Sequence, residues 1–76
     1  MSTPITHIMF PMRVPRILAT HIRHEMKMWA GHCAVSINVM EDTGSFHVLQ
    51  TVEARGNEEG IKAFHDFVRR NYARYL

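Results

Sequence analysis

Two segments of alternating side chains, joined by a short polar turn, constrain the fold of this chain more than any other feature. From residue 33 to 40 the sequence CAVSINVM changes between two faces at every position, which is the period of a β-strand. Residues 46–55 repeat the pattern. The intervening residues 41–45 contain Gly44, which we expect to adopt a positive φ in a hairpin loop. The two segments therefore predict an antiparallel β-hairpin.

One set of alternate residues in each predicted strand is the more apolar, and we expect this inner set to face the core. Gln50 is the polar exception within it, which leaves the register of the second hairpin strand open by one residue. The predicted inner set consists of Cys33, Val35, Ile37, Val39, Phe46, Val48, Val52 and Ala54.

Patterns of helical period lie on both sides of the hairpin. The helix before it is predicted to contain Pro15 in its first turn and to end at Gly31 in a left-handed conformation. The helix after it is predicted to begin at Asn57, a good N-cap residue. Trp29 is expected in the core as part of the first apolar stripe. The two stripes are Leu18, Ile22, Met26 and Trp29, and then Ile61, Phe64, Val68, Tyr72 and Tyr75.

A short apolar segment, residues 5–12, comes first and predicts a strand with Ile8, Phe10 and Met12 inward. The element order is thus β-α-β-β-α, and the right-handed crossover places the last strand between the other two. We predict one α+β domain over residues 1–76, with a three-stranded antiparallel sheet in the order 1-3-2 and both helices on one face. This element order resembles a ferredoxin-like fold truncated by its last strand, a resemblance that implies no function.

Homodimerisation is expected for three reasons. A chain of 76 residues with a single cysteine lacks the usual supports of a small domain, because it has no disulfide and no complete zinc pattern. The first and second strands would also be sheet edges, open to another chain. The second face of the sheet is half apolar, as oligomer interfaces often are. The candidate dimer-interface residues on that face are His7, Met9, Asn38, Met40, His47 and Leu49.

Charge is segregated along the chain. The two helical stretches, residues 13–27 and 62–76, each hold four cations and one acid, whereas residues 41–59 hold five acids and one cation. Basic helices suit a partner with an acidic surface, either a protein or the phosphates of a nucleic acid. The candidate partner-binding residues are Arg16, Arg23, Lys27, Arg69, Arg70 and Arg74.

No pattern for catalysis or for a cofactor is present in the sequence. His21, His24, His32 and Cys33 could be drawn into a metal site, but three of them have a structural explanation. Cys33 belongs to the inward set of a strand, His24 lies near the basic face of the helix, and His32 lies near the helix C-terminus. A thiol that faces the core is also a poor nucleophile. The chain shows no paired carboxylates and no glycine-rich phosphate loop. We therefore expect no enzyme, no cofactor and no metal.

The sequence favours a small non-enzymatic protein-binding module that we expect to form homodimers and to bind and modulate a larger macromolecular complex. Phage-encoded inhibitors of host defence, such as anti-CRISPR proteins, belong to this size class. The alternative is a basic protein that contacts nucleic-acid phosphates through its two helices. A sheet-face reader of RNA is disfavoured, because no aromatic residue is expected on the open face. The N-terminal segment does not resemble a signal peptide and no membrane span is expected, so we predict a cytoplasmic location.

Overall fold

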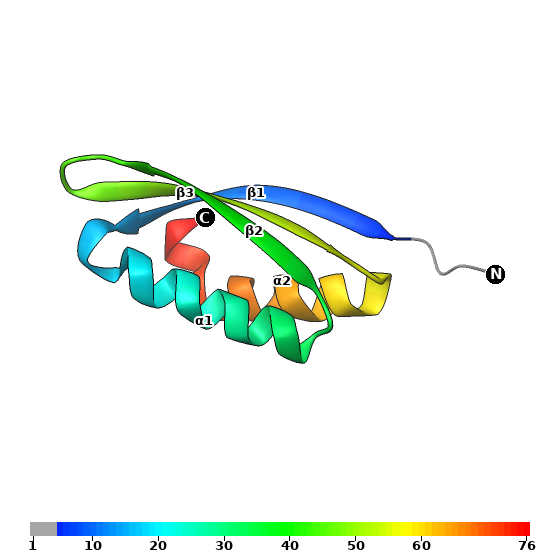
Figure 1. Ribbon diagram of the computed structural model, residues 1–76. Coiled ribbons are helices and arrows are strands. Elements are labelled where there is room, and N and C mark those ends of the chain that lie inside the picture. The colour runs from blue at the N-terminus through cyan, green and yellow to red at the C-terminus, as the bar shows by residue number, and fades with distance from the viewer. Residues whose placement is uncertain (1–4) are drawn as a thin grey trace.

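The computed structural model describes residues 5–76 and confirms the α+β fold (Figure 1). The elements follow in the predicted order: β1 (Thr6–Pro15), α1 (Ala19–His32), β2 (Ser36–Thr43), β3 (His47–Gly56) and α2 (Glu58–Tyr72). A short 3-10 helix η1 (Arg16–Leu18) precedes α1, and a second one η2 (Ala73–Tyr75) follows α2. The sheet is antiparallel in the order β1-β3-β2, and both helices cover the same face of it (Figure 1).

The first strand is longer than the sequence predicted. Its pairing with β3 runs from Thr6 opposite Gly56 to Pro15 opposite His47, so it continues past Met12. Prolines are tolerated in β1 because it is an edge strand, where one side of the backbone needs no partner. Pro15 therefore ends the strand and caps η1, instead of lying in the first helical turn. The extension carries Val14 into the core, where it is fully buried.

The core lies between the inner face of the sheet and the two helices. In α1 the predicted stripe is partly wrong, because Leu18 and Trp29 are 38% and 44% exposed. Ala19 and Ala30 are buried instead of Leu18 and Trp29. The small side chains of these two alanines allow the helix to lie close to the sheet. The other core residues are Met12, Val14, Ile22, Met26, Val35, Val48, Val52, Ala54, Ile61, Phe64, Val68 and Tyr72.

The turn between α1 and β2 differs from the prediction. The helix passes Gly31 and continues to His32, and the left-handed residue is Ala34, with φ of 56°. This turn lies against the start of α2, where a Cβ at Gly60 would approach the carbonyl oxygen of Cys33. As a result β2 begins at Ser36, and Cys33 is half-buried in the turn instead of in the strand.

The register of β3 is settled by Gln50, which is fully buried on the inner face. Its Nε2 donates to the carbonyl oxygen of Ala19 at 2.9 Å and to Oε2 of Glu41 at 3.0 Å. Its Oε1 has no hydrogen-bond partner among the described residues. The predicted inner set of β3 is therefore right from Val48 to Ala54. The N-cap prediction for α2 is also right, since Asn57 Oδ1 accepts from the backbone N–H of Gly60 at 2.7 Å.

Candidate functional site

The end of the β2–β3 hairpin lies against the start of α1 and forms the most exposed apolar surface of the described chain. The backbone N–H of Arg16 donates to the carbonyl oxygen of Phe46 at 2.9 Å, and that of Gly44 donates to the carbonyl oxygen of His47 at 2.8 Å. These bonds hold the loop in place next to η1. We call the resulting surface the tip; it consists of Pro15, Arg16, Ile17, Ser45 and Phe46.

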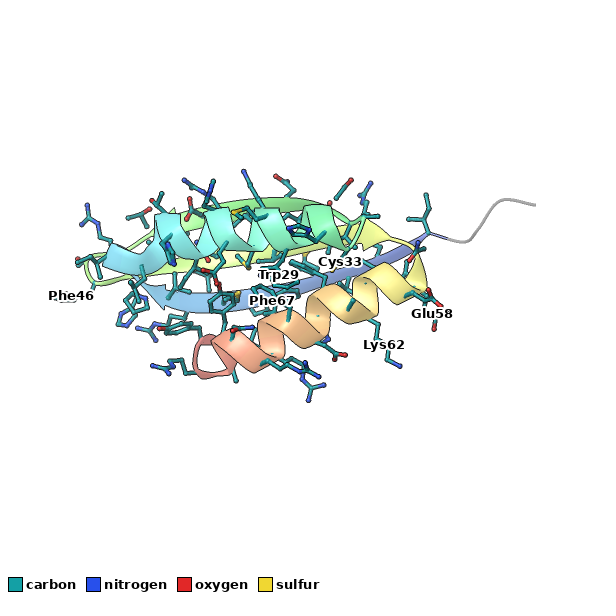
Figure 2. The ribbon with its side chains drawn as sticks, turned by 90° about the horizontal axis from the view of Figure 1, so that it is seen from below. Trp29, Cys33, Phe46, Glu58, Lys62 and Phe67 are labelled. Atoms are coloured by element: carbon teal, nitrogen blue, oxygen red, sulfur yellow. The ribbon has the colours of Figure 1, made fainter. Side chains whose placement is uncertain are left out.

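Two large apolar side chains stand out from the tip into solvent. Ile17 is 90% exposed and Phe46 is 81% exposed, the highest values among the large apolar residues of the described chain. Figure 2 shows Phe46 at one extremity of the molecule, at the opposite end from Glu58 and Lys62. A pair of this kind on one rigid surface is typical of a binding site, because scattered single residues are the normal case.

The inward assignment of Phe46 was therefore wrong. The strand begins one residue later, at His47, and Phe46 belongs to the hairpin loop, beyond the end of the core. Gly44 also differs from the expectation, since no glycine of the described chain has a positive φ. Sequence reasoning named Arg16 as a partner-binding residue but missed the two exposed apolar side chains of the tip. The one available signal was Ile17, which is apolar but lies outside the stripe of residues 18, 22, 26 and 29.

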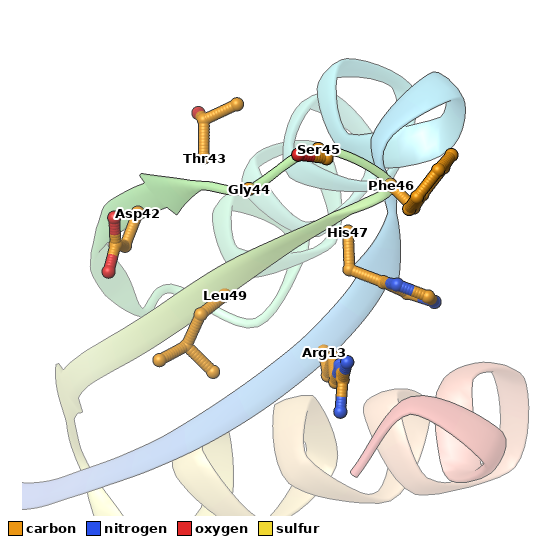
Figure 3. A pocket seen from close by; sticks show the side chains of 8 residues that line it. All are labelled: Arg13, Asp42, Thr43, Gly44, Ser45, Phe46, His47 and Leu49. Carbon is orange, nitrogen blue, oxygen red and sulfur yellow. The ribbon is translucent and has the colours of Figure 1, made fainter.

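Basic side chains flank the tip. Arg13 and His47 line a shallow hollow together with Arg74, Tyr75 and Pro15. The guanidinium carbon of Arg74 lies 5.9 Å from the centre of the Tyr75 ring, a cation–π contact that orients this arginine. Arg13 and His47 also line a second hollow, of about 490 Å³, together with Leu49 and Asp42. Figure 3 shows this second hollow from close by. The tip thus has an apolar centre and a mostly cationic margin.

The six predicted partner-binding cations do not have the same surroundings. Arg16 is part of the tip and Arg74 lies beside it. Arg23 forms an ion pair with Glu41 of β2, so its charge is partly compensated within the chain. Arg70 lines a groove between the helices. The remaining two, Lys27 and Arg69, are exposed on α1 and α2.

The groove between the helices is centred on Trp29, whose ring stacks on that of Phe67 with 4.7 Å between the ring centres. Two acids, Glu25 and Asp66, and one cation, Arg70, line it with Ala63 and Asn71. Figure 2 shows Trp29 and Phe67 meeting between α1 and α2. The mixed charge and the stacking indicate that this contact serves mainly to join the two helices.

The open sheet face carries all six predicted dimer-interface residues, and each of them is exposed. The strand register arranges this face in rows across β2, β3 and β1. In successive rows, Asn38, Glu53 and Met9 are followed by Met40, Thr51 and Pro11, and then by Asp42, Leu49 and Arg13. His7 lies beside the first row, with its Nε2 at 3.5 Å from a carboxylate oxygen of Glu53.

A titratable side chain of α2, Tyr72, is paired with an acid of α1 in the described chain. Burial raises the pKa of the Tyr72 phenol, and the hydrogen bond that its hydroxyl donates to the Glu25 carboxylate adds to this rise. The pair joins α2 to α1, and His21 Nε2 lies 3.2 Å from the same carboxylate. Within residues 5–76 no three His, Cys, Asp or Glu side chains are placed to hold a metal ion.

Comparison of the chain with protein-family models, with curated proteins and with solved structures finds no match. Among the described helices, none has both the length and the apolar character that crossing a bilayer requires. The tip and the open sheet face are two exposed surfaces of the described chain that carry large apolar side chains.

Proposed function

We propose that the protein is a non-enzymatic binding module that attaches through its tip to an acidic protein surface of a larger complex and thereby modulates that complex. The observation that supports this is the joint exposure of Ile17 in η1 and Phe46 in the hairpin loop, at 90% and 81%, on two segments joined by the backbone hydrogen bond from Arg16 to Phe46. The assignment to phage-encoded inhibitors of host defence stays a prediction.

The energetics favour an apolar pocket on the partner. Full burial of a side chain such as Ile or Phe contributes about 1.5–3 kcal/mol, and two of them together offset part of the entropic cost of association. The backbone hydrogen bond from Arg16 to Phe46 holds together the two segments that carry these side chains before binding, which reduces the cost of ordering the backbone. Arg16 and Arg74 at the margin suit acidic residues around such a pocket, and they would accelerate association.

A nucleic-acid function is the second candidate, and the exposure of Phe46 next to Arg16 is the observation that favours it. An exposed aromatic ring with a neighbouring cation can stack on a base and contact a phosphate. The protein partner remains the stronger proposal, because the neighbour of Phe46 is Ile17, which has no aromatic face. Proteins that bind single strands usually stack successive bases on several aromatic side chains.

The test is site-specific crosslinking from the tip. A photoreactive phenylalanine analogue at position 46 is expected to capture one dominant protein from the source cells, whereas the same analogue at Lys62 captures none. With the purified partner, Phe46→Ser should weaken binding at least tenfold and Lys62→Ser should leave it unchanged. Both positions are exposed and lie at opposite ends of the molecule, so neither change disturbs the core (Figure 2).

Three results would refute the proposal. Equal capture from positions 46 and 62 would remove the tip as the binding surface. A salt-sensitive mobility shift with single-stranded DNA or RNA that Phe46→Ser abolishes would assign the tip to nucleic acid. Binding to vesicles of anionic lipid that is lost in the same variant would assign it to a membrane surface.

A further inference from the structure

We infer that the open sheet face binds a second copy of this chain face to face, around a twofold axis that runs along β3 past Leu49 and Thr51. The inference specifies the arrangement of the homodimer that the sequence predicts. Its main support is the order of charges across one row of the face, in which Leu49 lies between Asp42 on one edge strand and Arg13 on the other.

Rotation about an axis parallel to the strands keeps each row at the same position along the strands. It exchanges the two edges of the sheet, so that β1 of one copy lies opposite β2 of the second copy. Arg13 of one copy then lies opposite Asp42 of the second copy, and by symmetry the same contact forms twice. Leu49 lies opposite its own counterpart on the axis. The next row behaves in the same way, because Met40 and Pro11 exchange places on either side of Thr51. The face is therefore complementary to itself in charge and in apolar character.

The apolar part of the interface is provided by side chains that are otherwise unexplained on a solvated surface. Met9, Met40 and Leu49 are 53%, 50% and 44% exposed. The charged end of the face is compensated within each copy, since Glu53 lies 3.4 Å from Arg55 and 3.5 Å from His7. On the axis strand, Glu53 of one copy lies opposite Glu53 of the second copy, and the Arg55 guanidinium beside each carboxylate compensates the two like charges.

The size of the face indicates a weak dimer. Three strands about 4.8 Å apart and roughly ten residues long present about 450 Å² of flat area per copy. Two copies together bury about 900 Å² on that basis, near the lower limit of about 1,000 Å² for a specific interface. We expect a micromolar dissociation constant, so the oligomeric state must be measured up to several hundred micromolar.

Pairing through the strand edges is the main competing arrangement. The outer edge of β2 is free of proline over residues 36–43, and it could accept an antiparallel copy of itself. Such a dimer leaves Met9 and Leu49 in water and does not bring Arg13 near the acidic edge of the second copy. The face-to-face dimer accounts for both features, and the two arrangements respond differently to charge reversal.

The test uses two charge-reversal variants that complement each other. In Arg13→Asp, both symmetric contacts become pairs of carboxylates, and in Asp42→Arg both become pairs of guanidinium groups. Each variant alone should dimerise at least tenfold more weakly than the wild type in sedimentation equilibrium. An equimolar mixture of the two restores opposite charges at both contacts, so it should form a heterodimer with near-wild-type affinity, visible by mass in native mass spectrometry.

Lys62→Glu is the matched control, because it reverses a charge on α2, away from the sheet face, and should leave dimerisation unchanged. A wild-type protein that stays monomeric at several hundred micromolar overturns the inference. Dimers that are insensitive to both reversals, or variants that do not recover on mixing, overturn it in favour of edge pairing. The crosslinking test of the tip does not depend on the dimer, so the failure of one proposal is distinguishable from the failure of the other.

Discussion

Replacement of the buried amide at position 50 by a carboxyl should make the stability of the protein depend on pH. In Gln50→Glu the size of the side chain hardly changes, but both atoms that Nε2 contacts are hydrogen-bond acceptors, the carbonyl oxygen of Ala19 at 2.9 Å and the carboxylate of Glu41 at 3.0 Å. The site is also fully removed from water. Desolvation and the neighbouring carboxylate both favour the protonated form of the introduced group.

The magnitude follows from linkage between protonation and folding. A glutamic acid has a pKa of about 4.3 in the unfolded chain, and buried examples reach about 8. Because the pKa of the introduced carboxyl is higher in the folded state, the folded protein keeps this proton to a higher pH than the unfolded chain does. The stability of the variant is therefore intact below pH 4 and falls as the pH rises toward 8. One pKa unit corresponds to about 1.36 kcal/mol. The free energy of unfolding of the variant is therefore lowered by about 1 kcal/mol at pH 5 and by about 3.6 kcal/mol at pH 7. A domain of this size has only about 4–11 kcal/mol in total.

Urea unfolding of the wild type and the variant at pH 5 and pH 7 measures this difference. We expect the variant to lose about 2.5 kcal/mol more than the wild type over that interval. Ser45→Asp is the control, since it adds the same charge in an exposed loop and should follow the wild type within about 0.5 kcal/mol. Parallel pH profiles for Gln50→Glu and the wild type would show that the buried site does not exclude the ionised carboxylate, and the reasoning would be wrong.

Two further predictions concern single contacts. Ala34 has a φ of 56°, so Ala34→Gly should raise the free energy of unfolding by about 1 kcal/mol, whereas Ala63→Gly on the exposed face of α2 should lower it by a similar amount in the same urea titration. The raised pKa of Tyr72 means that the unfolded chain loses this proton first, so stability should fall as the pH rises above about 10. Tyr72→Phe should reduce that alkaline loss, as unfolding of the wild type and the variant at pH 9 and pH 11 would show.

The fold was predictable because its main signals are periodic and local. Alternation over 33–40 and 46–55 identified both hairpin strands, and the handedness of the crossover then placed β3 between β1 and β2. The stripe of α2 was correct because Ile61, Phe64 and Val68 are spaced at three and four residues and all are buried. Where the pattern was strong over several turns, the element and its inner face followed from it.

The ends of the elements were less predictable, because they depend on contacts that are distant in sequence. Gly31 looked like the end of α1, but the helix continues to His32 and the turn then packs against Gly60. Phe46 belongs by alternation to the inner set of β3, but it lies at the end of the hairpin, where no core residues are beneath it. The tip depends on the meeting of that loop with η1, some 30 residues earlier in the chain, and no local pattern carries this information.

Gln50 was predictable in part: its place in the inner set followed from the alternation, but its hydrogen-bond partners did not. Its position in an apolar set marked it as an exception in the sequence, but its partners could not be derived. Ala19 is 31 residues away and Glu41 lies on the neighbouring strand. A polar residue in a periodic apolar set thus indicates that a partner exists, while only the assembled fold shows which groups provide it.

The two proposed interfaces are compatible, because the axis of the dimer runs along the strands and leaves both tips at the same end. Arg13 then contacts Asp42 of the second copy, whereas Arg16 and Arg74 remain at the tip for the partner. A dimer of this shape presents Ile17 and Phe46 twice, at one end of the assembly, to a complex that contains repeated or paired subunits. Binding of the first tip raises the effective concentration of the second, so avidity can exceed the affinity of either contact alone. A micromolar dimer is sufficient for this purpose, since two copies held on neighbouring subunits also stabilise their contact with each other.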